Sequence, residues 1–239
     1  METHVTHRIA GILGGMGPEA TVDLMSRVIR ATPARDDADH VRMVVDNNPQ
    51  VPSRIRALLD GDGESAGPCL QDMARRLEAW GADFLAMPCN TAHYYYPEIR
   101  RAVSIPVLNM LDLSAETIAR EHPDIRTVGL LASSAILRLG LYEEALARQG
   151  LEAVSPRPDV QDALMAAIRR IKTGRYGNEV DAALNAAAAQ LADAGAGVLL
   201  IACTELSVVA DRLNTPCPVV DSAQVLAEAV VHEARRAGP

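Results

Sequence analysis

Two cysteines occupy similar settings far apart in the sequence, and both side chains could carry acid–base chemistry. Cys89 ends the apolar run DFLAMPC and precedes Asn90 and Thr91, while Cys203 ends GVLLIAC and precedes Thr204. A thiolate on one side of a bound molecule can remove a proton from carbon, and a thiol on the opposite side can return one. This two-base arrangement inverts a stereocentre. Helices starting at these polar residues would favour thiolates and bound carboxylates alike.

A second interpretation is that these cysteines are small buried hydrophobes, which is the common fate of a free cysteine. Their matched settings favour the chemical interpretation. Cys69, within a helical pattern, and Cys217, between prolines, have no such counterpart and are expected to be structural. Four cysteines without CxxC spacing predict free thiols in a reducing compartment, the cytoplasm.

The chain alternates short apolar runs with amphipathic segments, which predicts parallel sheets covered by helices on both faces. The expected strands are 8–14, 41–47, 83–89, 105–110, 127–133, 197–203 and 217–221. The expected helices are 18–31, 67–80, 111–121, 135–149, 160–172, 179–194 and 223–236.

The sequence also repeats itself weakly. AGILGGMG matches VGLLASSA, FLAMPCNT matches LLIACTEL, and SIPVLNMLD matches PCPVVDSAQ, in the same order. We therefore predict two similar α/β lobes related by a pseudo-twofold axis, formed by residues 1–108 with 221–239 and by residues 109–220. Ligands bind beyond the carboxyl ends of strands in such sheets, so both cysteines are expected to face one cleft between the lobes.

Other ligand classes fit less well. GGMGPEA (14–20) approximates a dinucleotide fingerprint, but Asp46 lies 29 residues after Gly17 instead of about 20. We interpret this segment as a flexible loop lining the cleft. His93 has no second ligand at metal spacing, so we predict a histidine on a helix surface and no metal site.

The composition limits the partners. A net charge of −8 argues against nucleic acid and anionic membranes. Neither a signal peptide nor an apolar run long enough to span a bilayer is evident. An anionic small molecule remains compatible if cations are placed locally, and Arg54 and Lys172 both lie next to predicted element ends.

Four motifs resemble the cofactor-independent, two-cysteine aspartate racemase branch of the aspartate/glutamate racemase family. They are GGMGP (14–18), NNPQVPSR (47–54), PCNTAH (88–93) and ACTELS (202–207), and the resemblance runs nearly end to end. It implies two pseudo-symmetric lobes, an active site between them, no cofactor and usually a homodimer.

The resemblance also implies roles for individual residues. Cys89 and Cys203 would be the paired bases. The substrate α-carboxylate would be held by Asn90, Thr91 and Thr204, and the distal carboxylate of an acidic amino acid by Arg54 and Lys172. Met16 and Gln50 would line the pocket.

One loop departs from the family pattern, which is usually Ala-Thr-x-Gly-Thr but here reads ASSAI (132–136). Ser133 can replace a threonine hydroxyl, whereas Ile136 removes one. Ile136 either faces the substrate and relaxes specificity, or packs under the following helix with Leu139 and Leu146.

We therefore predict a pyridoxal-independent racemase that interconverts L- and D-aspartate. The alternatives are a glutamate or broad-specificity amino-acid racemase, an isomerase or decarboxylase that uses a single thiol, and a ligand-binding module without catalysis. The presence of both cysteines favours racemisation over the last two.

Overall fold

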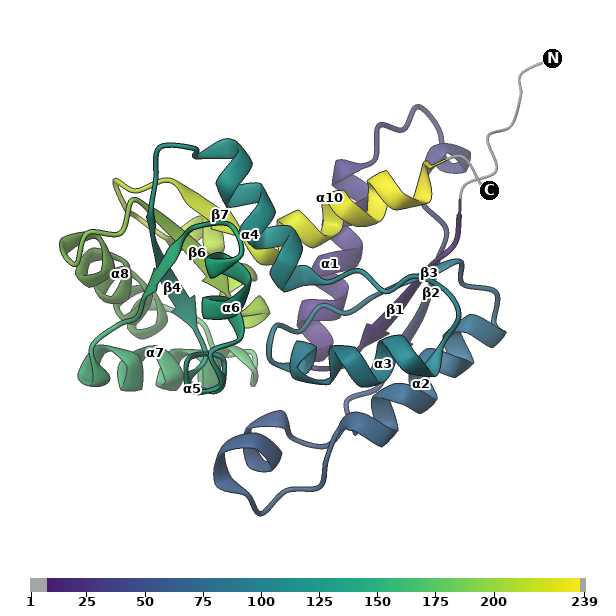
Figure 1. Ribbon diagram of the computed structural model, residues 1–239, viewed down its shortest axis with the longest axis horizontal. Coiled ribbons are helices and arrows are strands. Elements are labelled where there is room, and N and C mark those ends of the chain that lie inside the picture. Colours follow the sequence, from purple (N-terminus) through teal and green to yellow (C-terminus); the bar gives the residue numbers. More distant parts are fainter. Residues whose placement is uncertain (1–7, 237–239) are drawn as a thin grey trace.

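The computed structural model describes residues 8–236, which form two α/β lobes side by side (Figure 1). The strand order is β2-β1-β3 in the first sheet and β5-β4-β6-β7 in the second, and all neighbouring strands are parallel. The strands are β1 (Ala10–Gly14), β2 (Met43–Asn47), β3 (Phe84–Ala86), β4 (Thr127–Ala132), β5 (Glu152–Val154), β6 (Val198–Ala202) and β7 (Val219–Asp221). The prediction of two parallel-sheet α/β lobes is confirmed.

One predicted strand needs correction, and one observed strand was missed. Residues 105–110 form only an isolated bridge, in which Val107 pairs with Leu85. The neighbouring Pro106 has no N–H to donate, although its carbonyl accepts from Leu85 at 2.8 Å. The edge strand β5 was not predicted, because its residues are exposed or half-buried and give no apolar run.

The helices follow the predicted amphipathic segments, with additional short ones. They are α1 (Pro18–Ala31), α2 (Gly67–Ala79), α3 (Tyr96–Ala102), α4 (Met110–Glu121), α5 (Ser134–Leu139), α6 (Leu141–Ala147), α7 (Pro158–Ile171), α8 (Asn178–Asp193), α9 (Thr204–Ser207) and α10 (Ser222–Ala234). The single helix predicted over 135–149 is divided into α5 and α6 at Gly140, whose φ of 61° is left-handed. Glycine adopts this conformation at little steric cost, so it ends α5.

The internal repeat is visible in the packing of one glycine in each lobe. A Cβ atom on Gly11 of β1, or on Gly129 of β4, would lie within 3.3 Å of three side chains. For Gly11 these are Leu77, Ala82 and Leu85; for Gly129 they are Leu191, Ala196 and Leu199, each 114 residues further along the chain. The two lobes therefore pack the same helix end against the same strand position.

Two helices connect the lobes. α4 begins with Met110 in the core of the first lobe, while its Ile118 packs in the core of the second. α10 follows β7 of the second sheet and returns to pack against α1 (Figure 1). Its Leu226 contacts the first-lobe core, which includes Phe84. The division of the chain at residues 108 and 220 stays a prediction.

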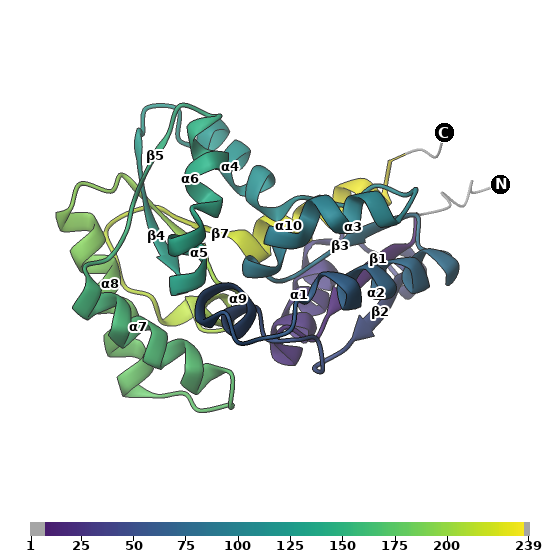
Figure 2. The ribbon, with the colours of Figure 1, turned by 60° about the horizontal axis from the view of Figure 1, so that its bottom comes forward.

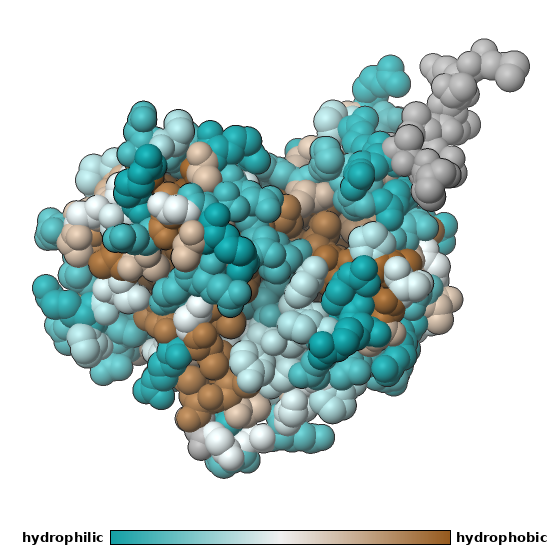
Figure 3. Space-filling model, in the orientation of Figure 1, coloured by the Kyte–Doolittle hydropathy of each residue, from teal (hydrophilic) through white to brown (hydrophobic). Residues whose placement is uncertain are grey.

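No helix within residues 8–236 has both the length and the apolar character needed to cross a bilayer. Hydrophilic side chains cover most of the face shown in Figure 3, where apolar areas are interrupted by polar ones.

The matched glycines lead to a stability prediction. Gly11→Ala and Gly129→Ala should each lower the free energy of unfolding by about 1–3 kcal/mol, because the added methyl group overpacks a filled site. Denaturant unfolding measures the change. Combining Gly129→Ala with Ala196→Gly removes one opposing methyl group and should recover part of the loss. Losses below about 0.5 kcal/mol in both single variants would contradict this account of the repeat.

Candidate active site

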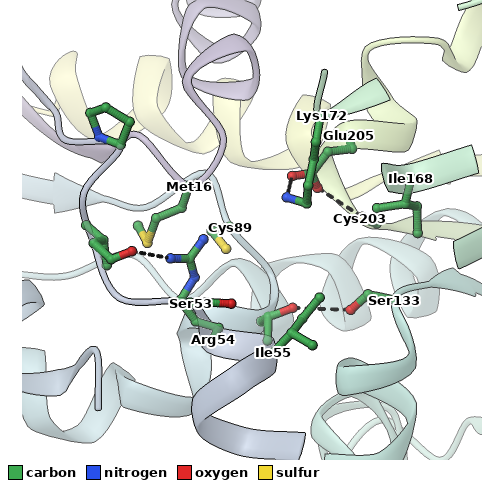
Figure 4. A pocket seen from close by; sticks show the side chains of 13 residues that line it. Met16, Ser53, Arg54, Ile55, Cys89, Ser133, Ile168, Lys172, Cys203 and Glu205 are labelled. Carbon is green, nitrogen blue, oxygen red and sulfur yellow. Dashed lines mark hydrogen bonds and ion pairs between the residues drawn. The ribbon is translucent and has the colours of Figure 1, made fainter. Parts of the chain in front are cut away.

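A cavity of about 300 Å³ lies between the lobes, a volume at the small end of ligand sites and suited to an amino acid. Both lobes contribute side chains to it (Figure 4). Among the predicted site residues, those lining the cavity are Met16, Arg54, Cys89, Thr91, Ser133, Lys172 and Cys203. Glu205, Ser53, Pro49 and three aliphatic side chains, Val51, Ile55 and Ile168, complete the lining.

The two cysteines reach the cavity from equivalent positions. Cys89 lies just beyond β3, and Cys203 follows β6 directly and caps α9. Both thiols are free, and the residues are 7% and 6% exposed. Each also packs against the apolar core of its own lobe. The cysteines are therefore buried as the alternative interpretation supposed, yet both open onto the same cavity.

Buried hydrogen bonds between the lobes hold the two cysteine turns together. The Asn90 side chain accepts from the Tyr142 hydroxyl at 2.6 Å and donates to Ser222 at 3.1 Å. Thr204 donates to the carbonyl of Pro88 at 3.2 Å. Asn90 and Thr204 are 2% exposed and do not line the cavity. In this structure their side chains join the lobes instead of facing the cavity.

Hydroxyl groups meet where the two lobes face the cavity. Thr91 and Ser133 lie on opposite lobes, and their oxygens are 3.3 Å apart. Ser133 also caps α5 by accepting from the N–H of Ile136. Each hydroxyl has one O–H donor that can rotate. Both can therefore donate to the same carboxylate when one is bound in the cavity.

Ile136 does not face the cavity. Its side chain is fully buried in the second-lobe core together with Leu146 and Tyr142. The structure thus supports the packing alternative for this residue, and the relaxation of specificity through Ile136 is withdrawn.

The segment 48–66 carries Arg54 into the cavity. Arg54 donates through Nη1 to the carbonyls of Val51 and Pro52 at 3.0 and 2.8 Å, which fixes its side chain on its own loop. The neighbouring Ile55 packs against the second-lobe core, so the loop bridges the lobes (Figure 2). Gln50 lies on the exposed turn of this loop, outside the cavity lining.

The glycine loop contributes the Met16 side chain to the cavity lining. It packs tightly against the neighbouring loop, because a Cβ atom on Gly15 would lie 2.2 Å from the backbone of Asn48. The Gly15 φ of 93° also favours glycine. The Gly15 N–H is bound to the Thr21 hydroxyl at 2.8 Å.

Lys172 and Cys203 are connected through Glu205, a residue that the sequence analysis did not single out. Glu205 forms an ion pair with the Lys172 ammonium, and its other oxygen accepts the Cys203 thiol at 3.1 Å. Burial opposes the charge of Lys172, but attraction to Glu205 and to the cysteines outweighs it and raises the pKa of Lys172. The only sequence signal for Glu205 was its position two residues after Cys203.

His93 is buried, so the prediction of a surface histidine was wrong. Its Nε2 accepts the N–H of Met110 at 3.1 Å, and the other nitrogen, Nδ1, lies 2.9 Å from the carbonyl of Cys89. The backbone N–H of Met110 can only donate, so Nε2 must be the unprotonated nitrogen. Nδ1 therefore carries the proton and donates to the carbonyl of Cys89. Burial lowers the pKa of His93 to about 4. A neutral imidazole therefore ties the Cys89 turn to the start of α4.

No group of three or more histidine, cysteine, aspartate or glutamate side chains within residues 8–236 is arranged to hold a metal ion. The side chains available for chemistry in the cavity are two thiols, one carboxylate, two cations and three hydroxyls. A thiol on each side of a small cavity is the geometry that proton transfer to opposite faces requires.

Comparison with known sequences gives matches over nearly the whole chain. The Asp/Glu/hydantoin racemase family profile matches residues 13–230. A broad-specificity amino-acid racemase of Bacillus subtilis strain 168 is 30% identical over 225 residues, covering 92% of this chain and 96% of the relative.

Solved structures share the two-lobe architecture. The aspartate racemase of Picrophilus torridus superposes with a TM-score of 0.80 and 33% identity, covering 95% of this chain and 94% of that one. A glutamate racemase of Francisella tularensis in complex with D-glutamate gives a TM-score of 0.68, covering 95% and 81% of the two chains. At 14% identity the latter comparison indicates a common fold alone.

The buried imidazole predicts an acid-sensitive step in stability. The folded state holds His93 neutral, so its pKa is about 4 when folded and near 6.5 when unfolded. Its contribution to the free energy of unfolding is therefore full above pH 6.5 and is lost as the pH falls toward about 4. The shift corresponds to about 3 kcal/mol. Denaturant unfolding of His93→Gln should show a weaker pH dependence in this window than the unmodified protein. The exposed His232 provides the control: His232→Gln should keep the original slope, and an unchanged slope in His93→Gln would refute the assignment.

Proposed function

The chain belongs to the Asp/Glu/hydantoin racemase family, and we propose that it racemises a free amino acid by moving the α-proton between Cys89 and Cys203. The observation that carries this proposal is that one thiol from each lobe lines the same cavity. No cofactor takes part in the proposed reaction. We also propose that the protein is a homodimer located in the cytoplasm.

The proposed reaction begins with one cysteine as thiolate and the other as thiol. The thiolate removes the α-proton, which leaves a planar carbanion whose charge extends into the α-carboxylate. The opposite thiol then donates its proton to the other face of the carbon, so the two sulfurs exchange roles. An α-proton is weakly acidic, so the developing charge needs hydrogen-bond donors close to the carboxylate. Thr91 and Ser133 are the candidate donors in the cavity.

Aspartate is the first candidate substrate. Arg54 and Lys172 bring positive charge into the cavity from opposite lobes, and such a pair can hold a distal carboxylate from two sides. The 33% identity to an aspartate racemase supports the same assignment.

A broad range of amino acids is the second candidate. The Lys172 ammonium is already compensated by Glu205, and Arg54 already donates to two backbone carbonyls. The aliphatic lining from Val51, Ile55 and Ile168 can accommodate an apolar side chain. The relative from Bacillus subtilis is described as having broad specificity.

The two-thiol mechanism is tested by removing each thiol separately. Cys89→Ala and Cys203→Ala should each abolish racemisation, because either change removes one of the two faces of attack. In deuterated water, each variant should still exchange the α-proton of one enantiomer without inversion, and the two variants should act on opposite enantiomers. Optical rotation and mass spectrometry read the two outcomes. Cys69→Ala and Cys217→Ala, which lie outside the cavity lining, are the controls. Full racemisation by either cavity variant excludes the mechanism.

The substrate assignment is tested at Arg54. If this side chain holds a distal carboxylate, Arg54→Ala should lower kcat/KM for aspartate by roughly one to two orders of magnitude more than for alanine, as expected for a lost charge-assisted contact. Arg56 is the matched control, because it lies two residues further along the same segment and pairs with Asp62 on the surface. Equal losses for both substrates would assign Arg54 to the α-carboxylate or to the loop structure.

A further inference from the structure

The two cavity thiols have unequal polar surroundings. The Cys203 thiol donates to a carboxylate oxygen of Glu205 at 3.1 Å. Within residues 8–236, the Cys89 thiol has no hydrogen-bond partner, and the hydrogen bonds of Cys89 are made by its backbone, whose N–H donates to Met87 and whose carbonyl accepts from His93. The pseudo-symmetry of the lobes therefore does not extend to the side chains around the two sulfurs.

Glu205 is placed to act on Cys203 specifically. It lies on the first residues of α9, two positions after Cys203, and it is 8% exposed. One of its oxygens faces the thiol while the other pairs with Lys172, whose side chain is 36% exposed. Lys172 comes from the end of α7, so both charges near Cys203 belong to the second lobe.

We propose that Glu205 is a positioning residue that keeps the proton on Cys203 in the free protein, so that Cys89 is the thiol that ionises first. A carboxylate accepting from a thiol stabilises the protonated sulfur and repels the thiolate. The effect of Glu205 on the Cys203 proton does not require the proposed racemase function. Its consequence for catalysis does rest on that function: the free enzyme removes a proton from the substrate face that Cys89 approaches.

The charges around the cavity agree with this assignment. Burial and the neighbouring Glu205 raise the pKa of the Cys203 thiol well above its usual value, and Lys172 opposes them. The remaining ionisable groups that face the cavity are Arg54 and Cys89, both from the first lobe. Glu205 is the only carboxylate in the cavity lining formed by the described residues, and of the two cavity thiols it accepts a hydrogen bond from Cys203 alone.

The test measures the reactivity of each thiol without any substrate. Full-length protein is alkylated with iodoacetamide between pH 6 and pH 10, and the rate at each cysteine is followed by peptide mass spectrometry. In the unmodified protein, the rate at Cys89 should rise at lower pH than the rate at Cys203. Because alkylation needs no turnover, this result stands or falls separately from the racemase assay.

Two substitutions should move Cys203 in opposite directions. Glu205→Gln removes the carboxylate charge and should shift the alkylation midpoint of Cys203 down by about one pH unit or more, the size expected for a charge at this distance. Lys172→Met removes the cation and should shift the same midpoint up. The midpoint of Cys89 should move less in both variants. A purely structural role of Glu205 would not produce opposite signs.

The matched control is Glu19→Gln. Glu19 is likewise a hydrogen-bonded glutamate, which accepts from the hydroxyl of Tyr176, but it lies outside the lining of the main cavity. It should leave both midpoints unchanged. Equal midpoints for Cys89 and Cys203 in the unmodified protein, or shifts of the same sign in Glu205→Gln and Lys172→Met, would overturn the proposal. If Glu205→Gln fails to fold, the comparison of the unmodified protein with Lys172→Met decides.

Discussion

The cavity depends on buried polar groups that must find partners across the lobe boundary. Asn90, Tyr142 and Ser222 come from three distant parts of the chain and satisfy one another where water is excluded. Leaving one such group unpaired would cost about 1–3 kcal/mol, which is more than the bond itself contributes. Arrangements that separate the two cysteine turns are therefore strongly disfavoured, and the relative position of the two thiols follows from this constraint.

Local sequence signals predicted most helices and strands, but they did not predict the contacts between residues far apart in the chain. Apolar runs marked β1 and β6, and the matched turns marked Cys89 and Cys203, because each signal lies within a few residues. The burial of His93 depends on Met110, 17 residues away, and the burial of Asn90 depends on residues 52 and 132 positions away. No periodicity encodes such pairings. Glu205 was missed for the related reason that a glutamate on a short helix usually remains in water.

The cavity shows how an acidic protein can present a net positive lining to a small ligand. The chain has a net charge of −8, yet the cavity lining contains two cations and one carboxylate. Arg54 reaches the cavity on a loop, whereas Lys172 is held at the end of a long helix. A change in the loop can alter one cation without disturbing either sheet. This separation of loop and scaffold is compatible with relatives that share the fold and differ in the amino acids named for them.

The hydrogen bond between Cys203 and Glu205 has a thermodynamic consequence for a racemase. Two enantiomers have the same free energy in water, so their equilibrium constant is one and kcat/KM must be equal in the two directions at every pH. An uneven distribution of protons between the sulfurs cannot favour one product at equilibrium. It can only change kcat and KM by the same factor for each enantiomer. The enantiomer with the lower KM then has a proportionally lower kcat.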